Sequence, residues 1–168
     1  MNANELRALQ APLKQQYRDE PGAALITLKA RGTLDSAAIA CRVDTGRALV
    51  EAGLHPATGG TGLQVCSGDM LLEALVACAG VTLRAVATAL EIPIRGGQLR
   101  AEGDLDFRGT LGVVKDVPVG FQAIRLSIDL DTDAGPEQLD RLLALTERYC
   151  VVLQTLRQSP EVTVHRGS

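Results

Sequence analysis

The chain has 168 residues, a formal net charge of -3, two Phe, two Tyr and no Trp. This length predicts one domain, residues 1–168, with a core of Leu, Val, Ile and Ala. The negative charge argues against nucleic acid or an anionic membrane as the partner. The scarcity of aromatic residues argues against a platform for single-stranded nucleic acid.

The four cysteines and two histidines of the chain help to predict its cellular compartment and whether it binds a metal ion. Residues 1–20 are mixed and polar, not a basic leader followed by an apolar stretch, so we expect no secretion. Four cysteines without an export signal do not suggest a disulfide scaffold, and we expect the cytoplasm. No C-x-x-C or H-x-x-x-H spacing occurs, so we expect neither a metal site nor a cofactor.

The N-terminal part of the chain predicts a short helix and then three strands. Asn2 or Asn4 can cap an amphipathic helix to about Arg18, interrupted at Pro12, and residues 1–20 form an N-terminal helical extension. Alternating apolar residues predict strands at residues 24–31, 39–44 and 48–52. A glycine-rich loop, residues 53–62, follows them and cannot form regular structure.

Residues 67–91 predict one long, mostly buried helix. Ser67 and Asp69 can satisfy amides of the first turn, and Pro93 prevents continuation. At about 100° per residue the polar positions form one narrow stripe, which contains Glu73, Gly80, Arg84, Thr88 and Glu91. The stretch is long enough to span a membrane, but Glu73 and Arg84 lie inside it, so we interpret it as a core helix.

The C-terminal part predicts two strands, a helix and a last short strand. Alternation predicts strands at Leu99–Phe107, with its charges facing water, and at Ile124–Asp131, with an irregular link between them. Pro136 opens a helix to about Leu153. Its apolar face contains Leu139, Leu142, Leu143, Thr146 and Cys150. Val162 and Val164 belong to the last strand, and the whole is α+β with a mostly antiparallel sheet and helices on one side.

Taken singly, the cysteines leave structural and chemical interpretations open. Cys41, in its strand, is best explained as a small apolar filler. Cys66 lies at the start of the long helix, where backbone dipoles can lower the pKa of a thiol. Cys78 lies in the middle of the helix, so a thiolate there needs a cation from the preceding strands and loop. The sources of that cation are Arg42, Arg47 and His55.

Two segments in this order resemble the OsmC/Ohr family, which comprises osmotically inducible protein C and the organic hydroperoxide resistance proteins. The segment Asp69–Cys78, followed by Val81-Thr-Leu-Arg and by Ile92-Pro-Ile, resembles the family's central helix. The helix end Leu145-Thr-Glu-Arg-Tyr-Cys, followed by the last strand, resembles its second signature. The resemblance covers roughly residues 25–164, and the pairing of the two motifs makes it specific.

The resemblance implies an intertwined homodimer whose two central helices pack together inside wrapped sheets. It also implies that Cys78 is the peroxidatic cysteine and Cys150 the resolving cysteine. An arginine from the N-terminal strands, Arg42 or Arg47, and the carboxylate of Asp69 at the helix start would orient and charge Cys78.

Three features of this chain depart from the family pattern. The family's Pro-Glu at the helix start is here Ser67-Gly68-Asp69, so the carboxylate is one carbon shorter. The proline that usually follows the second cysteine is Val151. The N-terminal arginine is not assigned uniquely, although Arg47 is preferred because it follows a flexible turn.

The leading hypothesis is a thiol-dependent peroxidase for organic hydroperoxides, restored by an external dithiol. A pocket with an apolar lining would favour an organic peroxide over hydrogen peroxide. Its expected residues are Leu71, Leu75, Val81, His55 and Cys66. Two alternatives use the same buried thiols. One is a non-catalytic dimer that binds a small apolar or electrophilic ligand, and the other is a redox-sensing dimer that uses Cys66.

Overall fold

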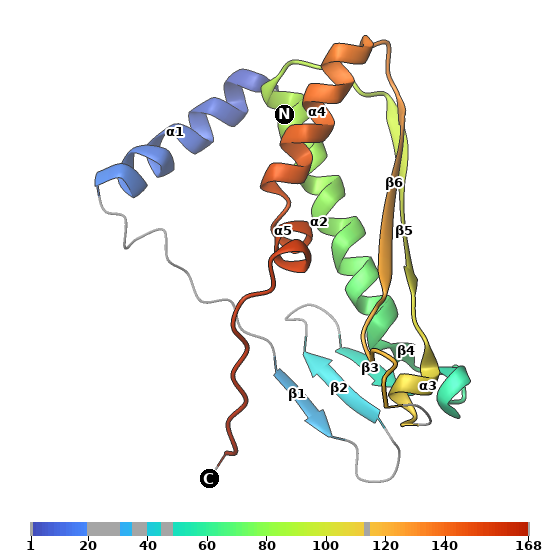
Figure 1. Ribbon diagram of the computed structural model, residues 1–168. Helices are drawn as coiled ribbons and strands as arrows, with labels where there is room; N and C mark the ends of the chain where they lie inside the picture. Colours follow the sequence, from blue (N-terminus) through green and yellow to red (C-terminus); the bar gives the residue numbers. More distant parts are fainter. Residues whose placement is uncertain (1, 20–30, 35–39, 45–48, 113–114, 168) are drawn as a thin grey trace. The chain divides into compact units, whose positions relative to one another are not determined.

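The computed structural model describes residues 2–19, 31–34, 40–44, 49–112 and 115–167. Helices and mostly antiparallel strands occur together in this part of the chain, as the α+β prediction requires. In order (Figure 1) they are α1 (Ala3–Asp19), β1 (Arg31–Leu34), β2 (Ala40–Asp44), β3 (Leu49–Gly53), the 3₁₀ turn η2 (Pro56–Thr58), β4 (Val65–Cys66), α2 (Ser67–Ala89), β5 (Gly96–Asp104), α3 (Phe107–Thr110), β6 (Ala123–Asp131), α4 (Pro136–Tyr149) and α5 (Val151–Arg157).

The strands form two mostly antiparallel sheets. In the first, β1 pairs with β2 and β2 with β3 in antiparallel fashion, and β3 pairs with β4 in parallel. The second sheet pairs β5 with β6. The N–H of Arg95 donates to the carbonyl of Asp131, and the N–H of Gln122 donates to the carbonyl of Asp104, each at 2.9 Å. The start of β5 therefore meets the end of β6, so these strands are antiparallel.

The chain forms two compact units, and it crosses between them within α1, α2, β5 and β6. The first unit contains Met1–Arg7, Ala74–Leu99 and Ile128–Ser168, and the second contains Ala8–Glu73 and Arg100–Ser127. The first unit therefore holds α4, α5 and most of α2. The second holds the four-stranded sheet, η2 and α3.

The core of the first unit lies where α2, α4 and β6 meet. Four residues spaced one turn apart form the buried stripe of α2, as helical periodicity requires. They are Leu75, Ala79, Leu83 and Ala87. Leu142 of α4 is fully buried in a cluster with Leu83 and Ala87, and Ile128 and Leu130 of β6 pack against that cluster. This packing fixes the position of α2 relative to α4.

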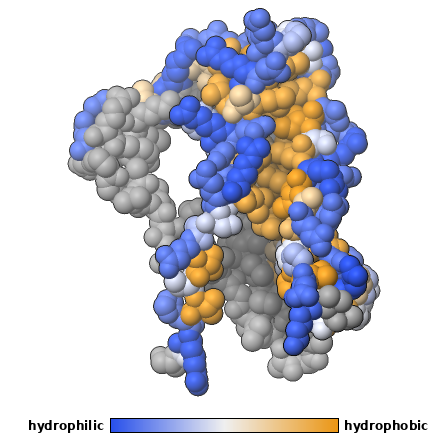
Figure 2. Space-filling model, viewed as in Figure 1, coloured by the Kyte–Doolittle hydropathy of each residue, from blue (hydrophilic) through white to orange (hydrophobic). Residues whose placement is uncertain are grey.

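The predicted long helix is confirmed, because α2 runs from Ser67 to Ala89. Within one chain, however, it is not mostly buried: Val81 is 73% exposed, Leu71 is 37% exposed, and the alanines at 74, 77 and 85 are exposed. Figure 2 shows apolar residues gathered on the face of the first unit that carries α2 and α4. By length and composition α2 could cross a membrane. Its buried stripe, packed on α4 and β6, is that of a core helix.

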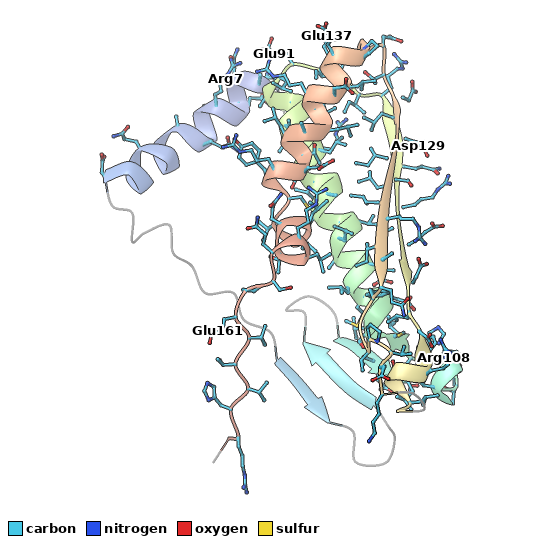
Figure 3. All side chains as sticks on the ribbon, viewed as in Figure 1. Arg7, Glu91, Arg108, Asp129, Glu137 and Glu161 are labelled. Carbon is cyan, nitrogen blue, oxygen red and sulfur yellow. The ribbon has the colours of Figure 1, made fainter. Side chains whose placement is uncertain are left out.

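The N-terminal predictions are partly confirmed. Helix α1 exists, but it is not interrupted at Pro12, because a helix can lose one backbone hydrogen bond at a proline by bending. Arg7 of α1 pairs with Glu91 at 3.1 Å, and the two side chains meet in Figure 3. Strands β2 and β3 confirm the second and third predicted strands. Residues 24–30 of the first predicted strand lie outside the described residues, and its last position, Arg31, begins β1.

The glycine-rich loop before β4 and the link between β5 and β6 each contain a short helical turn that the sequence did not predict. The expected strand Leu99–Phe107 is found at Gly96–Asp104, and its last residues turn into α3 instead. The carboxylate of Asp106 accepts the N–H of Arg108 at 3.0 Å and caps that turn, so Asp106 is half-buried rather than facing water. In the glycine-rich loop, Nδ1 of His55 accepts the N–H of Ala57 at 3.0 Å and caps η2.

The predicted helix over residues 136–153 is two helices, separated at Cys150. Cys150 has an extended backbone, φ -73° and ψ 105°, which a continuous helix does not allow. Its N–H donates to the carbonyl of Thr146, and its carbonyl accepts the N–H of Gln154, each at 2.9 Å. Cys150 therefore closes α4 and opens α5. The predicted apolar face of the helix is confirmed by its buried members Leu142, Thr146 and Cys150.

Of the last two predicted strands, the one at residues 124–131 is confirmed and the one at residues 162–164 is wrong for the single chain. Strand β6 matches the prediction over residues 124–131, and its exposed Asp129 points away from α2 in Figure 3. Residues 158–167 contain no helix or strand, and Val162 and Val164 are 79% and 93% exposed. Alternation makes a segment able to form a strand, but it becomes one only when a neighbouring strand pairs with it.

Candidate functional site

The thiols of Cys78 and Cys150 lie near enough to each other in the first unit for each to shift the pKa of the other. Cys78 is half-buried in the middle of α2, and Cys150 is fully buried at the junction of α4 and α5. Both cysteines are free thiols rather than a disulfide. The packing of α2 on α4 brings one thiol to the other, and the helix break at Cys150 exposes backbone amides beside them.

The pKa of the Cys78 thiol is lower than that of an ordinary cysteine. Burial acts in the opposite direction, because it disfavours the thiolate. Four hydrogen bonds together outweigh it: from the backbone of Val152, the thiol of Cys150, the backbone of Val151 and the hydroxyl of Thr82. All four favour negative charge on the Cys78 sulfur, so Cys78 forms its thiolate at lower pH than an ordinary cysteine does.

The pKa of the Cys150 thiol is raised, first by burial and then by its contact with Cys78. The backbones of Leu153 and Val152 lower the pKa of Cys150, but by less than burial and Cys78 raise it. The two shifts fit together, because they favour the thiolate at Cys78 and the protonated thiol at Cys150. A second thiol near a cysteine is what the capture of its oxidised form requires.

The amides at this site come from the first turn of α5. The first backbone bond of α5 joins the N–H of Gln154 to the carbonyl of Cys150. The N–H groups of Val151, Val152 and Leu153 therefore have no carbonyl one turn earlier within α5. They lie next to the sulfur atoms and serve as their donors.

The charged residues expected to activate Cys78 are only partly described. Arg47 lies outside the described residues, and Arg42 belongs to β2 without a described side chain. Asp69 is exposed in the first turn of α2. It precedes Cys78 by nine residues, which is about 13 Å along a helix axis. The roles of Arg42, Arg47 and Asp69 therefore stay predictions.

The residues expected to line a substrate pocket have different surroundings. Leu75 is buried in the core of the first unit, whereas Leu71 and Val81 of α2 are exposed. His55 stacks on Phe107, with ring centroids 4.8 Å apart. Cys66 is half-buried at the end of β4, directly before α2. That these five residues share one pocket stays a prediction.

A groove of about 740 Å³ lies at the far end of α2, within the first unit. Its lining contains Arg84, Thr88 and Glu91 but neither cysteine. The guanidinium of Arg84 donates to the carbonyl of Ile94 at 3.0 Å. Among the residues that the structure describes, no cluster of three or more His, Cys, Asp or Glu side chains could hold a metal ion. The thiol pair is therefore our candidate site in the first unit.

The sequence did not identify Thr82 or the amides of Val151 and Val152 as members of the site. The spacing of Thr82, four residues after Cys78, places it one turn along the same face and could have indicated it. No sequence signal indicated the amides. In a continuous helix through Cys150, these N–H groups would donate to backbone carbonyls one turn earlier. Only the break at Cys150 makes them available.

Comparison with known proteins agrees with this geometry. The family model described as OsmC-like protein matches residues 60–165, which include both Cys78 and Cys150. A comparison with curated protein sequences gives no match.

Three solved structures illustrate the similarity of fold. An OsmC-like protein from Mycoplasma pneumoniae has a TM-score of 0.66 at 16% identity, over 80% of this chain and 89% of that one. An organic hydroperoxide resistance protein OsmC from Legionella pneumophila has a TM-score of 0.62 at 18% identity, over 80% and 92%. The organic hydroperoxide resistance protein OhrB of Bacillus subtilis has a TM-score of 0.53 at 21% identity, over 81% and 94%.

The family match spans more than half of the chain and includes the long helix and the second cysteine helix. The structural matches show the same fold independently. The chain therefore belongs to the family of OsmC-like proteins.

Proposed function

We propose that this protein is a thiol-dependent peroxidase that reduces organic hydroperoxides through Cys78 and Cys150. One observation carries the proposal: a half-buried thiol whose pKa is lowered lies near a fully buried thiol whose pKa is raised. The thiolate is the form that attacks a peroxide, and the second thiol is placed to resolve the product. Fold relatives named organic hydroperoxide resistance proteins support the choice of substrate class.

The first step oxidises Cys78. Its thiolate attacks one peroxide oxygen of ROOH, the O–O bond breaks, and the products are the Cys78 sulfenic acid and RO⁻. The alkoxide takes a proton from water and leaves as the alcohol ROH. Two electrons pass from the sulfur to the peroxide. The hydrogen bonds that stabilise the thiolate also fix the sulfur in place for this attack.

The second step joins the two cysteines. The Cys150 sulfur attacks the sulfenic sulfur, an S–S bond forms, and hydroxide leaves and takes up the Cys150 proton as water. An external dithiol then reduces the disulfide by thiolate exchange and is itself oxidised to a disulfide. The net reaction converts a hydroperoxide and a dithiol into an alcohol, water and a disulfide. The cytoplasm, which maintains such dithiols, is the compartment that fits this cycle.

The proposal includes a homodimer. The exposed face of α2 carries Leu71, Val81 and the alanines at 74, 77 and 85. Small side chains allow a second helix to approach closely, and apolar residues so exposed favour burial against a partner. A second copy would cover this face beside Cys78 and give the thiol pair an apolar entrance, which suits an organic hydroperoxide better than hydrogen peroxide.

The test is consumption of cumene hydroperoxide in the presence of a dithiol. The native protein and Cys66→Ser are expected to turn over, whereas Cys78→Ser and Cys150→Ser are not. Hydrogen peroxide in place of cumene hydroperoxide tests the substrate class. No turnover by the native protein, with the hydroperoxide nonetheless bound, would favour a binding protein. Oxidation centred on Cys66 instead of Cys78 would favour a redox sensor.

A further inference from the structure

The groove at the C-terminal end of α2 is lined entirely by residues of the first unit. The start of α1, the last turns of α2 and the link to β5 form it. Its volume of about 740 Å³ lies within the range of small-molecule sites, about 300–1,000 Å³. We propose that this groove binds a small organic carboxylate, whose charged group pairs with Arg84 and whose apolar body covers Ala87, Ile92 and Ile94. The groove contains neither cysteine, so the inference does not rest on the proposed function.

Two of the three charged residues that line the groove, Glu91 and Arg95, are held by side chains of opposite charge. Glu91 pairs with Arg7 of α1 at 3.1 Å (Figure 3). Arg95 pairs with Asp131 at 2.6 Å and with Asp133 at 2.5 Å. A charged ligand would have to compete with these ion pairs to use either side chain.

Arg84 is the third charged residue of the groove, and a neutral group holds it in place. Nη1 of Arg84 donates to the carbonyl of Ile94 at 3.0 Å, and both residues line the groove. Within the part of the chain that the structure describes, no carboxylate pairs with Arg84. A guanidinium has five N–H donors in one plane, and it can bind a carboxylate through two parallel hydrogen bonds. Arg84 is therefore the cation that the groove offers to an anionic ligand.

The carboxylates around the groove favour a ligand with a single negative charge. Glu91 lines the groove beside Arg84, and Arg95 is shared by the two aspartates, Asp131 and Asp133. A doubly charged anion such as phosphate would meet the repulsion of these carboxylates, with one guanidinium to offset it. A monocarboxylate carries the charge that Arg84 alone can neutralise.

The base of the groove is apolar and is part of the core of the first unit. Ala87 and Ile92 are only 2% and 6% exposed. Both belong to the buried cluster that contains Leu83 and Leu142, and the half-buried Ile94 packs against it. A base supported by the core needs little ordering when a ligand binds. An apolar ligand body would leave water by covering it, so we expect a carboxylate with a hydrocarbon part.

Glu91 has a backbone conformation that favours glycine, with φ of 58°. It lies in the turn after α2, where the N–H of Ile92 donates to the carbonyl of Ala87 at 2.9 Å. Glycine is common in such a turn, and a glutamate costs free energy relative to it. Residues held in such conformations cluster at ligand sites. Here the glutamate brings a carboxylate to Arg7, which glycine could not do, and so links the start of α1 to the end of α2 at the groove.

The first test is calorimetric titration of the native full-length protein with 4-phenylbutyrate. The uncharged 4-phenylbutyramide and acetate are the matched probes, because one lacks the charge and the other lacks the apolar body. We expect saturable binding of 4-phenylbutyrate to one site per chain, and binding at least about tenfold weaker for each of the other two. Equal binding of the acid and the amide, or no binding of the acid up to about 10 mM, would overturn the inference.

The second test compares Arg84→Gln with Arg141→Gln. Arg141 is an exposed arginine of α4 that does not line the groove. Arg84→Gln is expected to weaken binding of 4-phenylbutyrate by at least about tenfold, and Arg84→Lys to restore part of the affinity. Arg141→Gln should bind as the native protein does. Equal affinities of the two glutamine variants would contradict the assignment of Arg84, and the uncharged probe decides the matter if Arg84→Gln has a lower melting temperature.

The ion pair at the groove gives a third test with opposite signs. Arg7→Gln leaves the negative charge of Glu91 beside the ligand and should weaken binding a few-fold, whereas Glu91→Gln removes that charge and should strengthen it. A change of the same sign in both variants would overturn the choice of a singly charged anion.

Peroxide turnover separates this inference from the proposed function. Cys78→Ser should bind 4-phenylbutyrate as the native protein does, and saturating 4-phenylbutyrate should leave the turnover of cumene hydroperoxide unchanged. Competition between the acid and the hydroperoxide would place the acid at the thiol pair and would refute a separate site. Because binding is measured without peroxide, a protein that binds the acid but lacks turnover would refute the peroxidase proposal alone.

Discussion

The thiols of Cys78 and Cys150 lie near enough for each to shift the pKa of the other, although 150 - 78 = 72 residues separate them in the sequence. The contact depends on two features of the fold. The packing of α2 against α4 brings the helices together, and the extended backbone at Cys150 ends α4 at the level of Cys78. A disulfide needs Cα atoms within about 7 Å, and that Cys78 and Cys150 meet this condition stays a prediction.

The first prediction concerns the separate roles of the two cysteines. In Cys150→Ser, Cys78 is expected to react once with cumene hydroperoxide and to remain as a sulfenic acid, which dimedone traps and mass spectrometry detects. Turnover should fall by about a thousandfold or more, because the two cysteines act as a unit. Cys78→Ser should give no trapped sulfenic acid at Cys150. Equal trapping at both positions would contradict the assignment of roles.

The second prediction concerns the pH dependence of the two thiols in the native protein. The pKa of Cys78 is lowered, so its thiolate persists below the ordinary cysteine pKa of about 8.5 and disappears only as the pH falls through the lowered value. The pKa of Cys150 is raised, so its thiolate forms only above that range. Alkylation followed by peptide mass analysis should therefore label Cys78 at pH 7 and leave Cys150 unlabelled. Preferential labelling of Cys150 at pH 7 would contradict the assigned directions.

Much of the fold could be predicted because periodicity determines it. The alternation in residues 124–131 and the apolar run after Ser67 lead directly to β6 and α2. The positions at which helices end were harder to predict. Cys150 ends a helix without any proline or glycine, because its backbone follows the packing of α4 and α5 and not a local preference. The unpaired Val162–Val164 segment shows that alternation does not itself supply a pairing partner.

The sequence predicted Cys78 and Cys150 as candidate site residues. It did not predict the groups that surround them. Cys78 and Cys150 stand in motifs that can be found by spacing and order. The donors around them depend on the angle at which two helices meet, which no local pattern encodes. Backbone amides such as that of Val151 carry no side-chain signature, so only a structure identifies them as part of the site.

The third prediction concerns the packing that brings the thiols together. Leu142 of α4 is fully buried against Leu83 and Ala87 of α2. Leu142→Ala removes these contacts and leaves a cavity, and it is expected to lower the free energy of unfolding by about 2–5 kcal/mol. Val119→Ala, at an exposed position, should change it by less than about 0.5 kcal/mol. Urea unfolding of the three proteins measures the difference, and equal stability of the two variants would contradict the packing described.

The fourth prediction tests the expected activation of Cys78 by a cation. A guanidinium near the sulfur would lower the pKa of Cys78 further, and its loss would shift the alkylation profile to higher pH. We expect Arg47→Ala to produce the larger shift and Arg42→Ala the smaller. In the third variant, His55→Ala, we expect no shift, because His55 is the substitute only if neither arginine approaches the sulfur. Replacing either arginine by lysine keeps the charge and should restore part of the profile. Native profiles in both alanine variants would leave the uncharged donors, Thr82 and the amides of α5, as the activating groups.

The fifth prediction concerns the homodimer. Two chains have a mass of 2 × 17.7 = 35.4 kDa, and light scattering after size exclusion should give this value at micromolar concentration. A stable dimer of this kind buries about 2,000 Å² or more, much of it apolar. Val81→Glu places a charge on the exposed apolar face of α2 and is expected to weaken association by at least about tenfold, because the carboxylate must lose its water. Leu63→Glu changes a more exposed apolar residue in the loop before β4, outside α2, and should leave the mass unchanged. A monomeric native protein, or a Val81→Glu variant that associates as strongly as Leu63→Glu, would show that α2 is not the interface.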